Sequence, residues 1–310
     1  MSLPPSVLKP AFDITRASHL VLGVRDIGRS RAFYVDTLGM LVSDADRDTL
    51  YLRGIEEAAH HSLVLRRSDR AVCERVGFRV FTEDDLDTLA AHFRGTGHAT
   101  AILDVPFQSR TLHVMDPVGV PLEFCASMTV MERAINRFET HVGACPMRLD
   151  HMQVLTPAVD AACAFYGQLG FRTSEYIVDD ETAAVRAVFM QRKGNPHDIV
   201  FMRNAGPRLH HVAFTCPEAH HLFHLCNVLA AAGFGEAVEW GPGQHFGPGY
   251  ARFVYLRDPD GHRIEFFNNH YQTMDVEDVP LRWVAPRNGE ASRWGVRPPQ
   301  AWREEATSFA

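Results

Sequence analysis

The sequence SHLVLGVRDIGRSRAFYVDTLGM, residues 18–40, has a second version in the same chain, DHMQVLTPAVDAACAFYGQLGF at residues 150–171. Both versions place a histidine at their second position, followed by an apolar strand pattern and then by Phe-Tyr and Leu-Gly on a helical pattern. A later pair repeats in the same order, DPVGVPLEF at residues 116–124 and DPDGHRIEF at residues 258–266. Motifs that recur in one order indicate two copies of one structural unit.

Each copy combines short apolar strand patterns with two amphipathic helices, the second of which is expected at residues 83–94 and 217–232. Gly39 and Gly170 suit the ends of the first helices, because glycine enters the left-handed region cheaply. The Asp-Pro-x-Gly motif is a turn that joins the last two strands. The pattern predicts an α+β fold with paired βαβββ modules in each of two domains.

The repeat also divides the chain. We expect an N-terminal domain over residues 12–126, a linker over 127–148, a C-terminal domain over 149–270 and a tail over 271–310. The tail contains Trp283, Trp294 and Trp302. Because three large apolar rings are rarely left in water, we expect the tail to pack on the body near the active site.

Composition excludes several classes of function. The chain has 310 residues, of which 46% are hydrophobic and 22% charged, and its net charge is −7. An acidic chain is a poor nucleic-acid binder, and no apolar run is long enough to cross a membrane. The N-terminus carries no signal-peptide pattern, so we expect a cytoplasmic protein. None of the six cysteines forms a Cys-x-x-Cys pair, which predicts free thiols and no zinc–thiolate site.

Three side chains of the second copy are typical metal ligands on neighbouring strands: His151, His211 and Glu265. Two imidazoles and one carboxylate on one face of a metal form the facial triad of non-heme Fe(II) oxygenases. His210 adjoins His211, but strand side chains alternate, so we expect it to point to the opposite face.

The first copy is an internal control. It keeps His19 and Glu123 at the matching positions, but Gly77 stands where the middle ligand would be. We therefore expect a metal in the C-terminal domain alone.

At this level of detail the chain resembles a known family. The segments RLDHMQVL, GPRLHHVAFTCPEAHH, GPGQH and YLRDPDGHRIEFFNNHYQTMD are similar to the type I extradiol catechol dioxygenases of the vicinal oxygen chelate superfamily. The branch that they most resemble is the homoprotocatechuate 2,3-dioxygenases. The resemblance runs from Phe12 to about Trp302.

The resemblance implies an activity and a set of site residues. It implies a homo-oligomeric enzyme that uses Fe(II), or Mn(II) in some members, to insert both atoms of O2 into a catechol, giving a muconic semialdehyde-type product. The metal ligands would be His151, His211 and Glu265. The groups around the substrate and O2 would be His197, His245 and Tyr255, and Gln153 and Phe189 would stand in the substrate pocket.

The chain departs from that branch where a carboxylated substrate is held by arginines. Trp240 precedes Gly241-Pro242-Gly243, and Glu290 and Ala291 stand at the aligned tail positions. An arginine fork is the usual holder of a carboxylate. We therefore expect a neutral, aromatic or apolar substituent, bound by Trp240 and Phe189, although Arg287 or Arg293 could still reach the pocket.

The fold alone leaves two alternatives open, because function depends on the site. One is a metal-dependent glyoxalase-like isomerase or lyase. The other is a metal-free protein that binds an aromatic compound.

Overall fold

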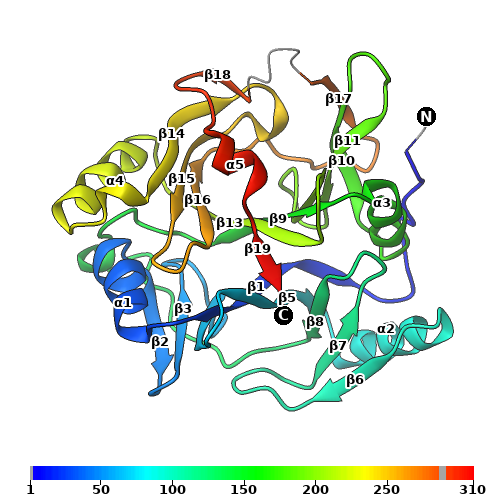
Figure 1. Ribbon diagram of the computed structural model, residues 1–310. Coiled ribbons are helices and arrows are strands. Elements are labelled where there is room, and N and C mark those ends of the chain that lie inside the picture. The colour runs from blue at the N-terminus through cyan, green and yellow to red at the C-terminus, as the bar shows by residue number, and fades with distance from the viewer. Residues whose placement is uncertain (1–2, 286–290) are drawn as a thin grey trace.

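The computed structural model describes residues 3–285 and 291–310 and consists mainly of strands (Figure 1). The N-terminal half contains, in order, β1 (Ile14–Val24), α1 (Ile27–Arg31), η1 (Ala32–Thr37), β2 (Leu41–Ala45), β3 (Thr49–Arg53), β4 (Leu63–Arg67), β5 (Val72–Val80), α2 (Glu83–Gly95), β6 (Thr100–Leu103), β7 (Thr111–Met115) and β8 (Pro121–Cys125). Residues 126–148 connect the halves and contain η2 (Phe138–Thr140).

The C-terminal half repeats the order with β9 (Leu149–Thr156), α3 (Val159–Gln168), β10 (Arg172–Val178), β11 (Val185–Gln191), β12 (Ile199–Arg203), β13 (Arg208–Thr215), α4 (His220–Ala231), η3 (Gly235–Ala237), β14 (Val238–His245), η4 (Pro248–Tyr250), β15 (Arg252–Arg257) and β16 (Arg263–Asn268). The tail adds β17 (Leu281–Val284), β18 (Ser292–Trp294), α5 (Gln300–Glu304) and β19 (Thr307–Phe309).

Strand pairing is the same in both halves. β1 pairs parallel with β4 and antiparallel with β5, which pairs parallel with β8. In the second half, β9 pairs parallel with β12 and antiparallel with β13, which pairs parallel with β16. These pairings confirm the prediction of an α+β fold built from repeated βαβββ modules. A βαβββ module has three strands after its helix. The first of these three strands is β2 in one half and β10 in the other, and the sequence patterns did not predict either.

Alternation along the central strands separates a core face from a site face. Met152 and Val154 of β9 lie in the main hydrophobic core, together with Ile264 and Phe266 of β16. That core also contains apolar side chains of α2, α3 and α4, so the helices cover this face. Side chains such as His151 and Glu265 fall on the opposite face, because strand residues alternate. A functional site on these strands therefore forms on the face away from the helices.

The two halves are joined by reciprocal hydrogen bonds between repeated motifs. Tyr34, from the Phe-Tyr motif of the first copy, donates to Asp258 Oδ2 in the turn of the second copy, at 2.8 Å. Tyr166, its counterpart, donates to Asp116 Oδ2 in the turn of the first copy, at 3.1 Å. All four side chains are buried. Each copy therefore places its helix against the turn of the other.

The tail closes over both halves. β19 pairs antiparallel with β13, at Arg208 and Leu209, and parallel with β5, at Val72 and Cys73. In Figure 1 the red segment of α5 and β19 runs down from the C-terminal half to the N-terminal half. The last residues of the chain thus fix the edge of the strand that carries His211.

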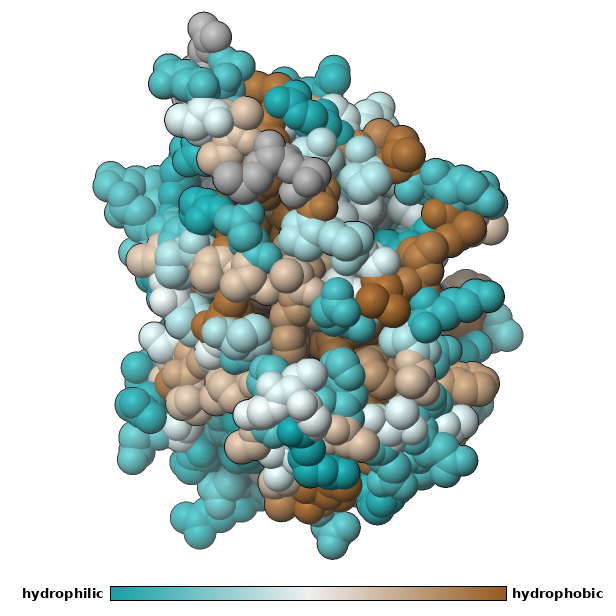
Figure 2. All heavy atoms as spheres, turned by 90° about the vertical axis from the view of Figure 1, so that its right-hand side faces the viewer, coloured by the Kyte–Doolittle hydropathy of each residue, from teal (hydrophilic) through white to brown (hydrophobic). Residues whose placement is uncertain are grey.

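The surface is mainly polar on the face seen in Figure 2, where hydrophobic groups form small patches among hydrophilic ones. All six cysteines are free. Over residues 3–285 and 291–310, no helix combines the length and hydropathy needed to span a membrane.

Replacing Tyr34 or Tyr166 by Phe is expected to destabilise the fold without altering the site. Each change leaves a buried carboxylate short of one donor, which costs roughly 1–3 kcal/mol in the free energy of unfolding. Urea unfolding of each variant measures that loss, with Tyr250→Phe as an exposed control. A loss as small as that of the control would show that these hydrogen bonds do not hold the halves together.

Candidate active site

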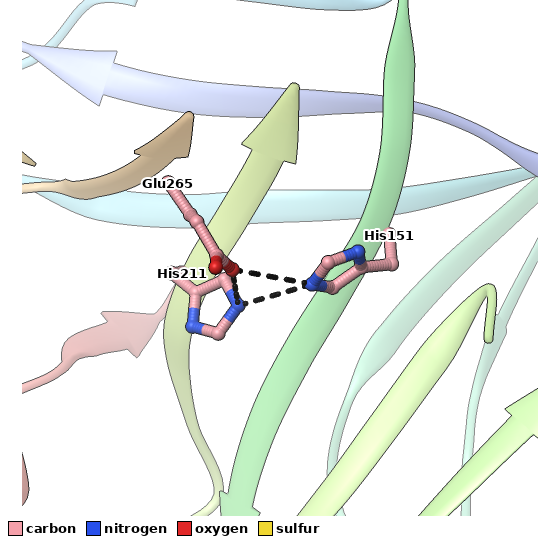
Figure 3. Close-up of side chains that lie close together, drawn as sticks. All are labelled: His151, His211 and Glu265. Carbon is pink, nitrogen blue, oxygen red and sulfur yellow. Dashed lines mark hydrogen bonds and ion pairs between the residues drawn. The ribbon is translucent and has the colours of Figure 1, made fainter. Parts of the chain in front are cut away.

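Three predicted ligands meet on the site face of the C-terminal half (Figure 3). His151 Nε2 lies 3.4 Å from Glu265 Oε2, His211 Nε2 lies 3.1 Å from the same oxygen, and the two nitrogens are 3.4 Å apart. The three residues come from β9, β13 and β16, and each is at most 3% exposed. The predicted cluster is therefore assembled, with its donor atoms turned toward one point.

His211 is oriented by its neighbour His210, which does not follow the alternation of side chains expected along a strand. β13 has an irregular register between Leu209 and His211, so His210 is an extra residue in the strand, as in a β-bulge. The bulge brings His210 Nδ1 to 2.7 Å from His211 Nδ1. The expectation that His210 points to the opposite face is wrong, because the bulge breaks the alternation.

The hydrogen bonds of His210 fix the tautomer of His211. His210 Nε2 lies 2.8 Å from the Trp302 carbonyl, which can only accept, so this nitrogen carries the proton. Burial, followed by the nearby Arg263 charge, lowers the pKa of His210 well below its usual range, so its ring is neutral. His210 Nδ1 must then accept from His211 Nδ1. The Nε2 lone pair of His211 is left free to face the cluster.

His151 is oriented in the same way by Asp150. His151 Nδ1 donates to Asp150 Oδ2 at 2.9 Å, and Asn195 donates to the other oxygen at 2.6 Å. Burial alone would raise the pKa of Asp150, but Lys193 and the donors from His151 and His270 hold it well below its usual range. A charged Asp150 keeps the proton of His151 on Nδ1 and its lone pair on Nε2.

Glu265 connects the cluster to two further predicted residues. Its Oε1 lies 3.2 Å from His245 Nε2, which is 3.3 Å from the Tyr255 hydroxyl. Burial raises the pKa of Glu265, but the imidazoles of His151, His211 and His245 around it more than offset that effect, so the pKa lies well below its usual range and the carboxylate stays charged. One side of the cluster thus carries an imidazole and a phenol.

His197 lies on the other side of the cluster. Its ring is buried, 4.2 Å from that of His151, 4.8 Å from that of His270 and 5.2 Å from that of Phe189. Its Nδ1 has no hydrogen-bond partner. Burial, followed by His151 and His270, lowers the pKa of His197 well below its ordinary value. A neutral imidazole with an unpartnered nitrogen can exchange a proton with a bound molecule.

A cavity opens over the cluster. Its floor is formed by the cluster residues with His197, His245 and Tyr255, and Gln153 and Phe189 also line it. The remaining lining residues are Ile177, Val200, Met202, Phe246, Pro248, His270, Ala291 and Trp302. None of the described lining residues is Arg or Lys. Sequence reasoning missed His270, although it follows Glu265 closely in the motif IEFFNNH.

Trp240 does not line this cavity, in contrast to its predicted role in substrate binding. Its ring stacks on Tyr255, with centroids 5.4 Å apart and an angle of 5°, and its Nε1 donates to the Val296 carbonyl at 2.8 Å. Trp240 therefore supports Tyr255 from behind. Of the tail positions, Ala291 lines the cavity and Arg293 is exposed, while Arg287 and Glu290 lie outside the described residues.

The first copy does not form an equivalent cluster. His19 is bonded through Nε2 to Glu123 Oε1, and its ring fills the space that a side chain at Gly77 would need. Within the described parts of the chain, His151, His211 and Glu265 are the one group of three donors arranged for a metal ion. This agrees with the expectation of a metal site in the C-terminal half.

The geometry of the cluster fits a divalent ion. At metal–ligand distances of roughly 2.1 Å, neighbouring corners of an octahedron lie about 3 Å apart, close to the separations observed here. A single proton could bridge one pair of these atoms, whereas a cation satisfies all three. Because each histidine presents a lone pair and Glu265 is charged, the three residues suit the facial arrangement of non-heme iron sites.

Comparison with known proteins places the chain in a class. Residues 16–124 and 148–266 match the family described as the Glyoxalase/Bleomycin resistance protein/Dioxygenase superfamily. The chain belongs to this superfamily. The two matched segments correspond to the two copies of the repeat.

More specific relatives share nearly the full length. The homoprotocatechuate 2,3-dioxygenase of Arthrobacter globiformis has a TM-score of 0.94 and 34% identity, covering 100% of this chain and 97% of that one. The enzyme of Brevibacterium fuscum, solved with 3,4-dihydroxyphenylacetate, has a TM-score of 0.93 and 37% identity, covering 98% and 96%. A manganese-dependent 2,3-dihydroxybiphenyl 1,2-dioxygenase of Geobacillus genomosp. 3 is 26% identical over 299 residues, covering 91% and 94%.

Within the superfamily, the chain is an extradiol ring-cleaving catechol dioxygenase, a metal-dependent enzyme that acts on a small molecule. The resemblance found in the sequence is confirmed. The relatives are ring-cleaving dioxygenases, which decides against the isomerase and the metal-free binding protein.

Replacing His211 by Ala is expected to abolish stoichiometric metal binding, because two donors remain where three are needed. Elemental analysis of the Fe(II)-loaded protein after gel filtration measures the bound metal. His19→Gln is the matched control, since it changes the corresponding histidine of the first copy. Full metal content in the His211→Ala protein would show that the cluster is not the metal site.

Proposed function

We propose that the enzyme uses Fe(II), held by His151, His211 and Glu265, to cleave a catechol with a neutral, apolar or aromatic substituent. Both atoms of O2 enter the product, a muconic semialdehyde-type compound. The observation that carries this proposal is a buried three-donor cluster at the base of a cavity whose described lining contains no Arg or Lys. Mn(II) accepts the same donors and remains an alternative metal.

The metal would act as a Lewis acid that lowers the pKa of a bound catechol hydroxyl, and would pass electron density from the ring to O2. The side chains around it then have separate tasks. His245 and Tyr255, on the Glu265 side, are placed to take up or share the proton of a diol oxygen. Trp240 keeps the Tyr255 ring in place by stacking.

His197 is placed to exchange a proton on the oxygen side of the reaction. It adjoins His151 and has an unpartnered Nδ1 in a buried setting. A neutral ring with an unpartnered Nδ1 can exchange a proton with an oxygen of the bound reactants as the reaction proceeds.

Replacing His197 by Asn is expected to lower kcat by roughly 10²–10⁴ while catechol binding changes little, because general acid–base help is lost after binding. Steady-state kinetics gives kcat, and anaerobic titration with catechol gives the dissociation constant. Glu218→Gln is an exposed control. If kcat stays within a factor of two of the unmodified enzyme, His197 has no role in proton transfer.

One wall of the cavity is apolar, and this supports the proposal of an uncharged substituent. Ile177, Phe189 and Val200 form a hydrophobic cluster with Met202, Phe246 and Trp283 packed against it. A carboxylate buried against such a wall would lack the arginine fork that usually holds it. Gln153, with Nε2 3.7 Å from Met202 Sδ, supplies an uncharged polar group at the edge of the wall.

A panel of substituted catechols tests this preference. With aerobic Fe(II)-loaded enzyme, we expect kcat/KM for 3- or 4-alkyl and aryl catechols to exceed that for 3,4-dihydroxyphenylacetate by at least about 100-fold, the size of two or three lost charged hydrogen bonds. A new yellow product absorbance measures turnover. Faster cleavage of the carboxylated substrate would refute the proposed substrate class, and no product from any catechol would refute the proposed activity.

Two further properties belong to this proposal. Large apolar side chains are exposed in the connecting segment and the tail, including Val130 at 80%, Phe138 at 75%, Met274 at 80% and Val279 at 79%. Such exposure supports a homo-oligomer that buries these segments. Six free cysteines support a reducing compartment, the cytoplasm.

A further inference from the structure

A buried carboxylate outside the metal cluster collects hydrogen bonds from three segments around the cavity. Glu175 lies on β10 and is fully buried. Its Oε1 accepts from the Gly249 backbone at 2.8 Å and from the Tyr271 hydroxyl at 2.9 Å, and its Oε2 accepts from Trp283 Nε1 at 2.5 Å. The donors belong to the loop before β15, the segment after β16 and β17 of the tail.

The loop that Glu175 holds, residues 246–250, forms part of the cavity wall through Phe246 and Pro248. It fits tightly between two groups. A Cβ on Gly247 would lie 2.7 Å from the Trp283 ring. A Cβ on Gly249, whose φ is +65°, would lie 2.8 Å from His270 Nε2 and 3.4 Å from His197 Cε1. The backbone of Gly249 therefore packs directly against the rings of His197 and His270.

We propose that Glu175 is a positioning residue for ring cleavage, which holds loop 246–250 against His197 and so fixes that ring beside the cluster. The inference rests on the proposed function, because it assigns Glu175 an effect on the proton transfer of His197. Glu175 touches neither the cluster nor the cavity, since it does not line the latter.

A carboxylate is suited to this task because it only accepts hydrogen bonds. Its two oxygens meet two N–H donors and one hydroxyl. A glutamine at this position has one oxygen and one NH2 group. In either orientation of the amide, the N–H of Gly249 or that of Trp283 faces another donor. The loop or the tail strand then loses its attachment, with little change in side-chain volume.

The test compares Glu175→Gln with Asp116→Asn, a buried carboxylate of the same kind that accepts from Val118, Val120 and Tyr166 far from the cavity. For Glu175→Gln we expect kcat to fall at least about ten-fold while the anaerobic dissociation constant of catechol changes less than about three-fold. For Asp116→Asn we expect lower thermal stability with kcat within about two-fold of the unmodified enzyme.

The coupling of O2 consumption to ring opening distinguishes a positioning role from a simple loss of stability, which would not change this coupling. If the His197 ring is displaced, the catechol can give two electrons and two protons to O2, forming a quinone and H2O2 without ring opening. We expect the ratio of H2O2 to ring-opened product to rise in Glu175→Gln and to stay unchanged in Asp116→Asn. An oxygen electrode with catalase, read beside product absorbance, measures this ratio.

Gly249→Ala gives an independent test from the other side of the loop, and also serves if Glu175→Gln does not fold. The added methyl group displaces the loop from His270, so we expect the same fall in kcat and the same uncoupling. Unchanged kcat and coupling in either folded variant would overturn the role of Glu175. If the unmodified enzyme cleaves no catechol, the proposed function fails instead.

Discussion

The site depends on the mutual repulsion of three electron-rich atoms that face one another in a buried setting. His151 Nε2, His211 Nε2 and Glu265 Oε2 are separated by 3.1–3.4 Å and are almost fully buried. Burying a carboxylate is costly unless it is paired. Asp150 and His210 hold the ring protons of His151 and His211 on Nδ1, so the Nε2 lone pairs of the neutral rings face Glu265. A divalent cation is the simplest partner that satisfies all three atoms.

The internal repeat shows how small a change removes such a site. In the first copy a histidine and a glutamate persist, but Gly77 allows His19 to lie across the missing position and bond directly to Glu123. Burial alone would raise the pKa of Glu123, while His19, His113 and Gln108 lower it, so its charge is satisfied by protein groups alone. The two copies have the same strand pairing, but in the first copy the histidine bonds directly to the acid, whereas in the second copy both face His211.

Repeated motifs and ligand spacing made the fold and the metal cluster accessible from sequence, because these follow strand alternation and strand order. The neighbouring His197, His245 and Tyr255 were predicted only through the resemblance to a known family. Other features depended on events that leave no periodic signal. The bulge at His210 turns its ring toward His211, although an unbroken strand would separate them. Trp240 lies behind Tyr255, since its face is decided by irregular pairing between β14 and β15. His270 and Trp302 reach the cavity from segments outside the central strands.

The metal cluster and parts of the cavity wall come from different kinds of segment. The three cluster residues come from central paired strands, where a shift in register would move every neighbouring side chain to the other face. Phe246, Pro248, Ala291 and Trp302 come from the loop before β15 and from the tail. Those segments can change without disturbing the strands beneath them, as surface connections generally do. The metal ligands are therefore fixed by the sheet, which also supplies Ile177, Phe189 and Val200 to the cavity wall, while the overlying segments complete that wall.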